Sequence, residues 1–131
     1  MNTRKEAREV AFKLVFEYLF SGETNDFSVA ELAEENELGS ELAYTKAVYH
    51  GVIENYDELA NIIKEKAIGF AYDRVYKVDK AIMLVALYEI LKMKDIPYAV
   101  SINEAIELAK KYGTEKSSSF INGILSKVEK K

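Results

Sequence analysis

The sequence predicts an all-α protein that folds as a single compact domain of about seven helices. Apolar residues recur at helical spacing along most of the chain, and no segment alternates apolar and polar residues as a half-buried strand does. Pro97 is the only proline among 131 residues, so little interrupts the helical pattern. The composition, 49% hydrophobic and 31% charged, is that of an ordinary globular domain.

The first two predicted helices begin at capping boxes, in which a hydroxyl and a carboxylate satisfy free backbone donors. Thr3-Arg4-Lys5-Glu6 is the first box, and its helix runs to about Phe20 and ends near Gly22. Ser28-Val29-Ala30-Glu31 is the second box, and it opens a short acidic helix that ends around Gly39.

Three further helix starts are predicted from single capping residues. Ser40 caps a helix that continues to Tyr56, and Asp57 caps the next one, which ends near Gly69. Asp79 caps a fifth helix, expected from residue 80 to about residue 94. Because residues 81–87 are apolar on all sides, this fifth helix is predicted to be central and surrounded by the others.

Two helices complete the predicted fold. Ser101-Ile102-Asn103-Glu104 forms a third capping box, and its helix closes at Tyr112 and Gly113, with glycine in its favoured position after a helix. A last helix holds the apolar residues between Phe120 and Val128.

The residue types that are rare in this chain exclude several kinds of site. There is no cysteine, which excludes disulfides, thiolate metal sites and cysteine nucleophiles, and His50 is the only histidine. We therefore expect no metal and no cofactor. No apolar run approaches the roughly 20 residues that span a bilayer, and charges interrupt the N-terminus where a secretory signal would lie. The protein is expected to be cytoplasmic, without membrane contact.

Charge is unevenly distributed along the chain, which carries a net charge of −4. Acidic residues dominate from Glu23 to Glu65, where Lys46 and Lys64 are the only bases. Lysines dominate from Lys110 to the C-terminus, and the N-terminus adds its own basic residues. The two ends of the chain therefore attract phosphate, whereas the acidic part repels it.

The first helix has a second face beside its core stripe. Arg4, Lys5 and Arg8 are followed on this face by Phe12, Phe16 and Leu19. Cations beside aromatic rings suit single-stranded nucleic acid, since phosphates meet the cations and bases stack on the rings. Alternatively, the cations are only solvated and the rings belong to the core. Cations are mildly disfavoured at a helix N-terminus, so three of them there without partners form a small local conflict.

Several segments, in this order, resemble the NusB family across essentially the whole chain. The start reads RKEARE at residues 4–9, and the central helix carries VDKAI at 78–82 and ALYE at 86–89. Residues 96–110 read IPYAVSINEAIELAK, and residues 120–125 read FINGIL. The resemblance implies one domain over residues 1–131, built from two packed helical halves.

The same resemblance implies a function without catalysis. NusB-like proteins bind boxA, a short single-stranded RNA element of ribosomal RNA operon leaders, together with the ribosomal protein NusE, and this complex helps RNA polymerase read through terminators. Motif matching assigns RNA binding to Arg4, Lys5, Arg8, Tyr112, Lys116 and Phe120. It assigns partner contact to Phe16 and Asp79. Phe16 stands where the family often has tyrosine, and Leu84 where many members have arginine.

Two other functions are compatible with the pattern. A NusB-like domain also precedes the catalytic region of certain ribosomal RNA methyltransferases, but this chain has no glycine-rich cofactor loop and no cysteine nucleophile. A protein-only adaptor or homodimer would bury Phe12, Phe16 and Leu19 against a partner. Salt separates the protein-only alternative from RNA binding, because an apolar interface responds little to salt.

Overall fold

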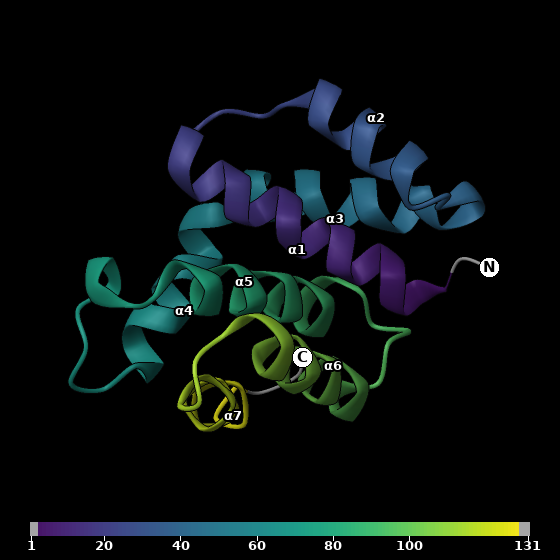
Figure 1. Cartoon of the computed structure of the whole chain (residues 1–131). Coiled ribbons are helices and arrows are strands. Elements are labelled where there is room, and N and C mark those ends of the chain that lie inside the picture. The colour runs from purple at the N-terminus through teal and green to yellow at the C-terminus, as the bar shows by residue number, and fades with distance from the viewer. Residues whose placement is uncertain (1–2, 129–131) are drawn as a thin grey trace.

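The computed structural model describes residues 3–128, which contain seven α-helices and two short 3₁₀ turns (Figure 1). This confirms the predicted all-α fold. The helices are α1 (Arg4–Ser21), α2 (Asp26–Glu35), α3 (Leu42–Glu54), α4 (Tyr56–Lys66), α5 (Lys77–Lys92), α6 (Tyr98–Tyr112) and α7 (Ser117–Leu125). The turns are η1 (Gly39–Glu41), before α3, and η2 (Tyr72–Arg74), before α5.

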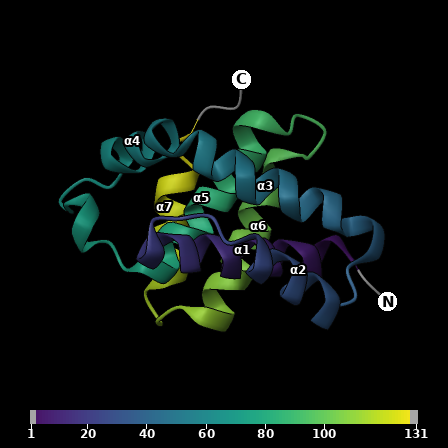
Figure 2. The ribbon, with the colours of Figure 1, turned by 90° about the horizontal axis from the view of Figure 1, so that it is seen from above.

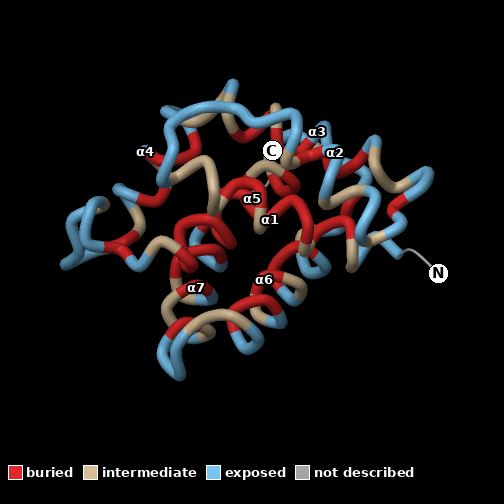
Figure 3. The backbone as a smooth tube through the Cα atoms, turned by 45° about the horizontal axis from the view of Figure 1, so that its top comes forward, coloured by how far each residue is buried: buried red, intermediate tan, exposed pale blue. Residues whose placement is uncertain are grey.

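The helices form two packed halves around α5. In Figure 1, α1, α2 and α3 make the upper half, whereas α4, α6 and α7 lie with α5 in the lower half. Seen from above, α1 and α3 lie across α5 (Figure 2). Every residue from 78 to 87 is buried, and the inward faces of α1, α6 and α7 are buried against the same centre (Figure 3). The prediction of a central fifth helix is confirmed.

At the first capping box the Thr3 cap forms as predicted, but the Glu6 carboxylate accepts from the Thr3 hydroxyl at 3.1 Å, and the second box does not form. The Thr3 hydroxyl accepts a hydrogen bond from the Glu6 amide at 3.3 Å, and α1 ends at Gly22, whose φ is 73°. At α2, Asn25 is the cap in place of Ser28, because its side chain accepts from the Ser28 amide at 3.0 Å. The Ser28 hydroxyl instead donates to Glu17 at 3.0 Å and ties α2 to α1.

Four other predicted starts are displaced by one to four residues. Ser40 lies inside η1 and does not cap α3, and Asp57 lies in the first turn of α4. Asp79 lies in the first turn of α5, which begins at Lys77. The third capping box is wrong as well, since α6 begins at Tyr98, directly after Pro97, and places Ser101 in its buried interior. A proline with φ of −60° is compatible with the start of a helix. Because α6 begins there, the Ser101 hydroxyl is not used as a cap and can make a tertiary contact.

Gly113 ends α6 at the predicted place, but for a different physical reason. Its φ of −91° is open to any residue, so no left-handed backbone requires glycine here. A Cβ at this position would lie 2.4 Å from the Ser117 hydroxyl oxygen. Glycine is therefore needed because the start of α7 closely approaches the end of α6.

Neither a membrane span nor a metal cluster is found in the described part of the chain. None of the helices within residues 3–128 is long and apolar enough to cross a bilayer. The same residues contain no group of three or more side chains placed to hold a metal ion.

Candidate nucleic-acid interface

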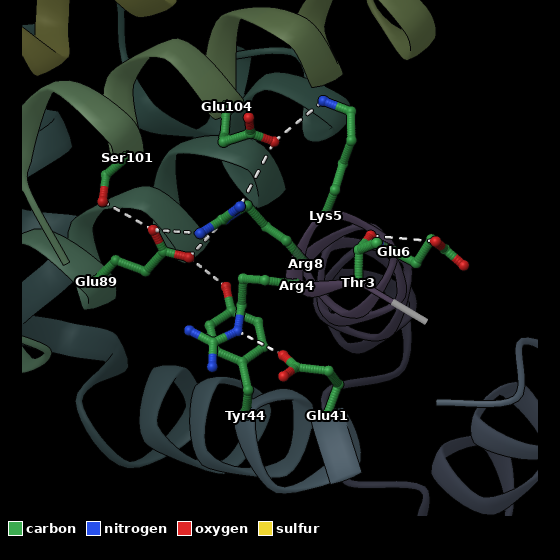
Figure 4. Close-up of polar contacts among 10 residues, drawn as sticks. All are labelled: Thr3, Arg4, Lys5, Glu6, Arg8, Glu41, Tyr44, Glu89, Ser101 and Glu104. Carbon is green, nitrogen blue, oxygen red and sulfur yellow. Dashed lines mark hydrogen bonds and ion pairs between the residues drawn. The ribbon is translucent and has the colours of Figure 1, made fainter. Parts of the chain in front are cut away.

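The basic start of α1 lies beside α3 and α6, and each of its three cations has an acidic partner (Figure 4). Arg4 is exposed, and its Nε lies 2.6 Å from a carboxylate oxygen of Glu41 in η1. Its guanidinium also stacks over the Tyr44 ring, 4.3 Å from the centroid. These contacts come from η1 and the first turn of α3, and they fix the direction in which the Arg4 side chain points.

Lys5 reaches across to α6. Its ammonium lies 3.3 Å from Glu104, and the same carboxylate oxygen lies 3.5 Å from a terminal nitrogen of Arg8. Lys5 remains exposed, whereas the Glu104 side chain is about three-quarters covered. The two helices enclose a groove of about 310 Å³ here. It is lined by Lys5, Arg8, Glu9, Glu104, Glu107, Leu108, Lys110 and Lys111.

Arg8 is buried, in contrast to its two basic neighbours. It is only 5% exposed, and its guanidinium donates to both oxygens of Glu89 on α5, at 2.6 and 3.3 Å. Glu89 is fully buried and also accepts from the Tyr44 hydroxyl and from the Ser101 hydroxyl, the latter at 2.7 Å. Figure 4 shows the three donors converging on Glu89 from α1, α3 and α6. This cluster therefore joins the two halves of the protein.

The charges in this cluster fix its protonation. Burial is the largest single effect and disfavours the Arg8 cation, but the hydrogen bond to Glu89 and the charges around Arg8 together outweigh it and raise the pKa of Arg8 above its usual value. Burial also raises the pKa of Tyr44, and the charge of Glu89 adds to this effect. Arg8 therefore stays charged and Tyr44 stays a hydrogen-bond donor at any physiological pH.

Tyr112 lies where the end of α6 meets α1. Its hydroxyl donates to Glu9, and the Lys111 ammonium lies 2.8 Å from the same carboxylate. Burial opposes ionisation of Glu9, but the bonds from Lys111 and Tyr112 prevail and lower its pKa. The Tyr112 ring is half-buried and packs 5.0 Å from the ring of Phe12. Tyr112 is thus adjacent to the basic groove.

The aromatic residues of α1 form a stripe that passes from the core to the surface. Phe12 is buried in the core, Phe16 is half-buried, and Phe20 is 65% exposed. Consecutive ring centroids are 6.2 and 5.0 Å apart. The Lys77 ammonium lies 5.2 Å from the centre of the Phe20 ring. Phe12 is therefore a core residue, whereas the end of the stripe is available to a partner.

The remaining predicted residues meet in a second groove of about 530 Å³, formed by the starts of α5 and α7 and the segment between α4 and α5. Its lining comprises Phe70, Arg74, Val75, Tyr76, Asp79, Thr114, Lys116, Ser117, Ser119 and Phe120. The rings of Phe70 and Phe120 pack edge to face, 5.3 Å apart. Lys116 is exposed, so aromatic rings and a cation occur together here as well.

Asp79 is the unusual residue of this second groove. It is 6% exposed, and burial raises its pKa, although a hydrogen bond from the Ser117 hydroxyl opposes the rise. Its Oδ1 has no hydrogen-bond partner among the described residues. A buried carboxylate oxygen without a donor is costly, so a donor from a bound molecule would stabilise it.

The structure thus separates the predicted residues into two places. Lys5 and Arg8 line the first groove with Tyr112 beside them, and Arg4 lies on the same end of α1 against Glu41 and Tyr44. Lys116, Phe120 and Asp79 share the second groove. Sequence reasoning missed the partners, above all Glu89. A usable signal was present, because a carboxylate in an otherwise apolar central helix is seldom buried unless it is paired.

Known proteins resemble this chain over nearly its whole length. Residues 5–130 match the NusB family. The transcription antitermination protein NusB of Carboxydothermus hydrogenoformans is 44% identical, over 95% of this chain and 91% of that protein. The Bacillus subtilis protein of the same name is 38% identical, over 96% of this chain and 94% of that protein.

Solved structures show the same fold. A crystal form of T. maritima NusB superposes with a TM-score of 0.88 at 33% identity, covering 97% of this chain and 91% of that chain. A chain in a crystal structure of the antitermination factors NusB and NusE in complex with double-stranded RNA superposes with a TM-score of 0.84 at 25% identity. That match covers 95% of this chain and 93% of the other.

Proposed function

The chain belongs to the NusB family of transcription antitermination proteins, and we propose that it binds boxA RNA of ribosomal RNA leaders together with NusE. In this proposal it acts in the cytoplasm, where the RNA–protein complex modulates elongation and termination by RNA polymerase, and it carries out no catalysis itself. The observation that carries the proposal is the basic start of α1, where Arg4 and Lys5 are exposed and Lys5 lines a groove.

In the proposed complex, one set of side chains would meet the phosphates and another set would meet the bases. Arg4, Lys5 and Lys116 are exposed cations, suited to phosphates, whereas Phe120 and Tyr112 offer partly exposed rings for base stacking. Arg8 is a positioning residue in this proposal, because its guanidinium is buried against Glu89. Three phosphate contacts predict a slope of about −2 in log affinity against log salt, from roughly −0.7 per phosphate of a single strand.

NusE is the proposed protein partner at the second groove and the aromatic stripe. Phe16 and Phe20 present rings at the end of α1, and the buried Asp79 has one oxygen without a donor. An arginine, a lysine or a backbone amide of the partner would supply that donor. The solved complex of a related NusB with NusE and RNA supports a shared assembly.

A homodimer is the second candidate for the aromatic stripe, and the 65% exposure of Phe20 favours it. Such a dimer would cover a large apolar side chain that otherwise faces water. Sedimentation of the chain alone at low and high salt tests this candidate, since an apolar dimer forms without NusE and persists at high salt.

Fluorescence anisotropy of a labelled boxA RNA and a scrambled control tests the proposed function. The wild type is expected to prefer boxA, to bind more tightly with NusE present and to weaken as salt rises. Arg4→Ala should weaken binding and reduce the salt slope by about 0.7. Lys46→Ala, which removes an exposed lysine from α3, is the matched control and should change little. Equal affinity for both RNAs, with and without NusE, would contradict the proposal.

A further inference from the structure

Three exposed cations, Arg4 and Lys5 at the start of α1 and Lys111 at the end of α6, form a basic face in which each cation is already paired with a carboxylate. Arg4 is held by Glu41 at 2.6 Å, Lys5 by Glu104 at 3.3 Å, and Lys111 by Glu9 at 2.8 Å. Each carboxylate occupies a position that an RNA phosphate oxygen would take when it pairs with the same cation. RNA must therefore displace these carboxylates or leave the cations paired.

Glu104 is the carboxylate best placed to compete with RNA. It lies on α6 at the rim of the first groove, and its side chain is 24% exposed, so a phosphate entering the groove reaches the same ammonium. Its second partner, Arg8, keeps two hydrogen bonds to Glu89 at 2.6 and 3.3 Å without it. Glu104 can thus lose its charge while the buried cluster that joins the two halves keeps its main bonds.

We propose that Glu104, and in the same way Glu41, limits the affinity of this face for RNA by competing with phosphate for Lys5 and Arg4. The inference rests on the proposed RNA function and adds to it the residues that weaken binding. The competing carboxylates lower the attraction that is common to all RNA sequences. Contacts to the bases then make up a larger share of the binding free energy. Phosphate contacts carry no sequence information.

Glu107 provides a matched control on the same helix. It lines the same groove three residues further along α6, is exposed, and forms no ion pair within the described residues. Glu104→Gln and Glu107→Gln therefore remove the same charge from the same groove, but only the first releases a paired cation. At about 0.15 M salt, screening over roughly 8 Å reduces the general effect of either charge.

The test compares the two variants with the wild type, on boxA and scrambled RNA. Glu104→Gln should tighten binding to both RNAs by about two- to fivefold, the range that an exposed ion pair contributes. Because the released attraction is common to both RNAs, the ratio of the two affinities should stay the same, and the salt slope should steepen. Glu107→Gln should change affinity by less than twofold. Equal effects of the two variants, or weaker binding by Glu104→Gln, would overturn the inference.

Glu41 supplies an independent second comparison in case Glu104→Gln does not fold, which its melting temperature reveals. Glu41→Gln releases Arg4 and should also tighten binding, whereas Glu35→Gln, at the exposed end of α2, should not. If the wild type binds boxA but no variant differs from its control, only the inference fails. If neither the wild type nor the variants bind RNA, the proposed function fails with it.

Discussion

Replacing Glu89 by glutamine tests the buried cluster that joins the two halves. The substitution keeps the shape of the side chain but leaves the Arg8 cation, which is 5% exposed, without its main counter-charge. Removing one partner of a buried ion pair costs about 3–5 kcal/mol. Glu104 remains 3.5 Å from Arg8, so we expect the low end, about 3 kcal/mol of unfolding free energy. With an unfolding entropy of about 2.1 cal/mol/K per residue, this lowers the melting temperature of a chain of this length by about 11 °C.

Calorimetry and urea unfolding measure this loss, with Glu58→Gln as the control. Glu58 pairs with Lys92 at 3.1 Å on the surface, and its loss should cost less than about 0.5 kcal/mol. The double variant Arg8→Met/Glu89→Gln removes both buried charges and should be more stable than Glu89→Gln alone. If Glu89→Gln is no more destabilising than Glu58→Gln, the buried pair does not join the halves as the structure indicates.

Three further predictions concern stability. Gly113→Ala should lower the free energy of unfolding by about 1–3 kcal/mol, because its Cβ would meet the Ser117 hydroxyl at 2.4 Å. Gly123→Ala, inside α7, places its Cβ within 4 Å of no other atom and should raise that free energy by up to about 1 kcal/mol. Chemical unfolding measures both changes. Because folding lowers the pKa of Glu9, its contribution to stability is present above the unfolded value of 4.5 and is lost as the pH falls through the lower folded value. Glu9→Gln should therefore flatten the acid limb of the unfolding free energy measured against pH, and an unchanged limb would refute this. Asp79→Asn should raise the melting temperature at pH 7, since folding raises the pKa of this carboxyl and burial penalises its charge. The gain in melting temperature should disappear in acid, where Asp79 is protonated. The same variant should bind NusE more weakly. A lower melting temperature of the variant at pH 7 would contradict the reasoning.

The sequence predicts the fold well because the helical periodicity is strong over long segments. The apolar run at residues 81–87 alone predicts the central helix, and these residues are all buried. Helix starts were less predictable, because a hydroxyl has several possible partners. Ser28 and Ser101 fit local capping boxes, yet each donates to a carboxylate on another helix, Glu17 or Glu89. Such a choice depends on tertiary neighbours, which the local pattern does not contain.

The candidate site shows the same limit. The face of α1 that carries Arg4 and Lys5 is exposed, as the periodicity of the helix suggested. Arg8 lies one turn further along the same face, but its partner Glu89 is 81 residues away in sequence. No local rule connects two residues at that separation, so the burial of Arg8 becomes visible only when α1 is packed on α5.

The partners of the three N-terminal cations resolve the conflict that the sequence poses. Cations at a helix N-terminus meet the positive end of the helix dipole, at a cost of a few tenths of a kcal/mol each. In the folded chain, η1, α5 and α6 each supply a carboxylate to this end of α1. The buried pair, with Glu89, stabilises the contact between the two halves. The exposed pairs, with Glu41 and Glu104, compensate the dipole in the free protein, and in the proposed RNA complex they would compete with phosphate. The proposal therefore implies that stability of the free chain and affinity for RNA are opposed at Arg4 and Lys5.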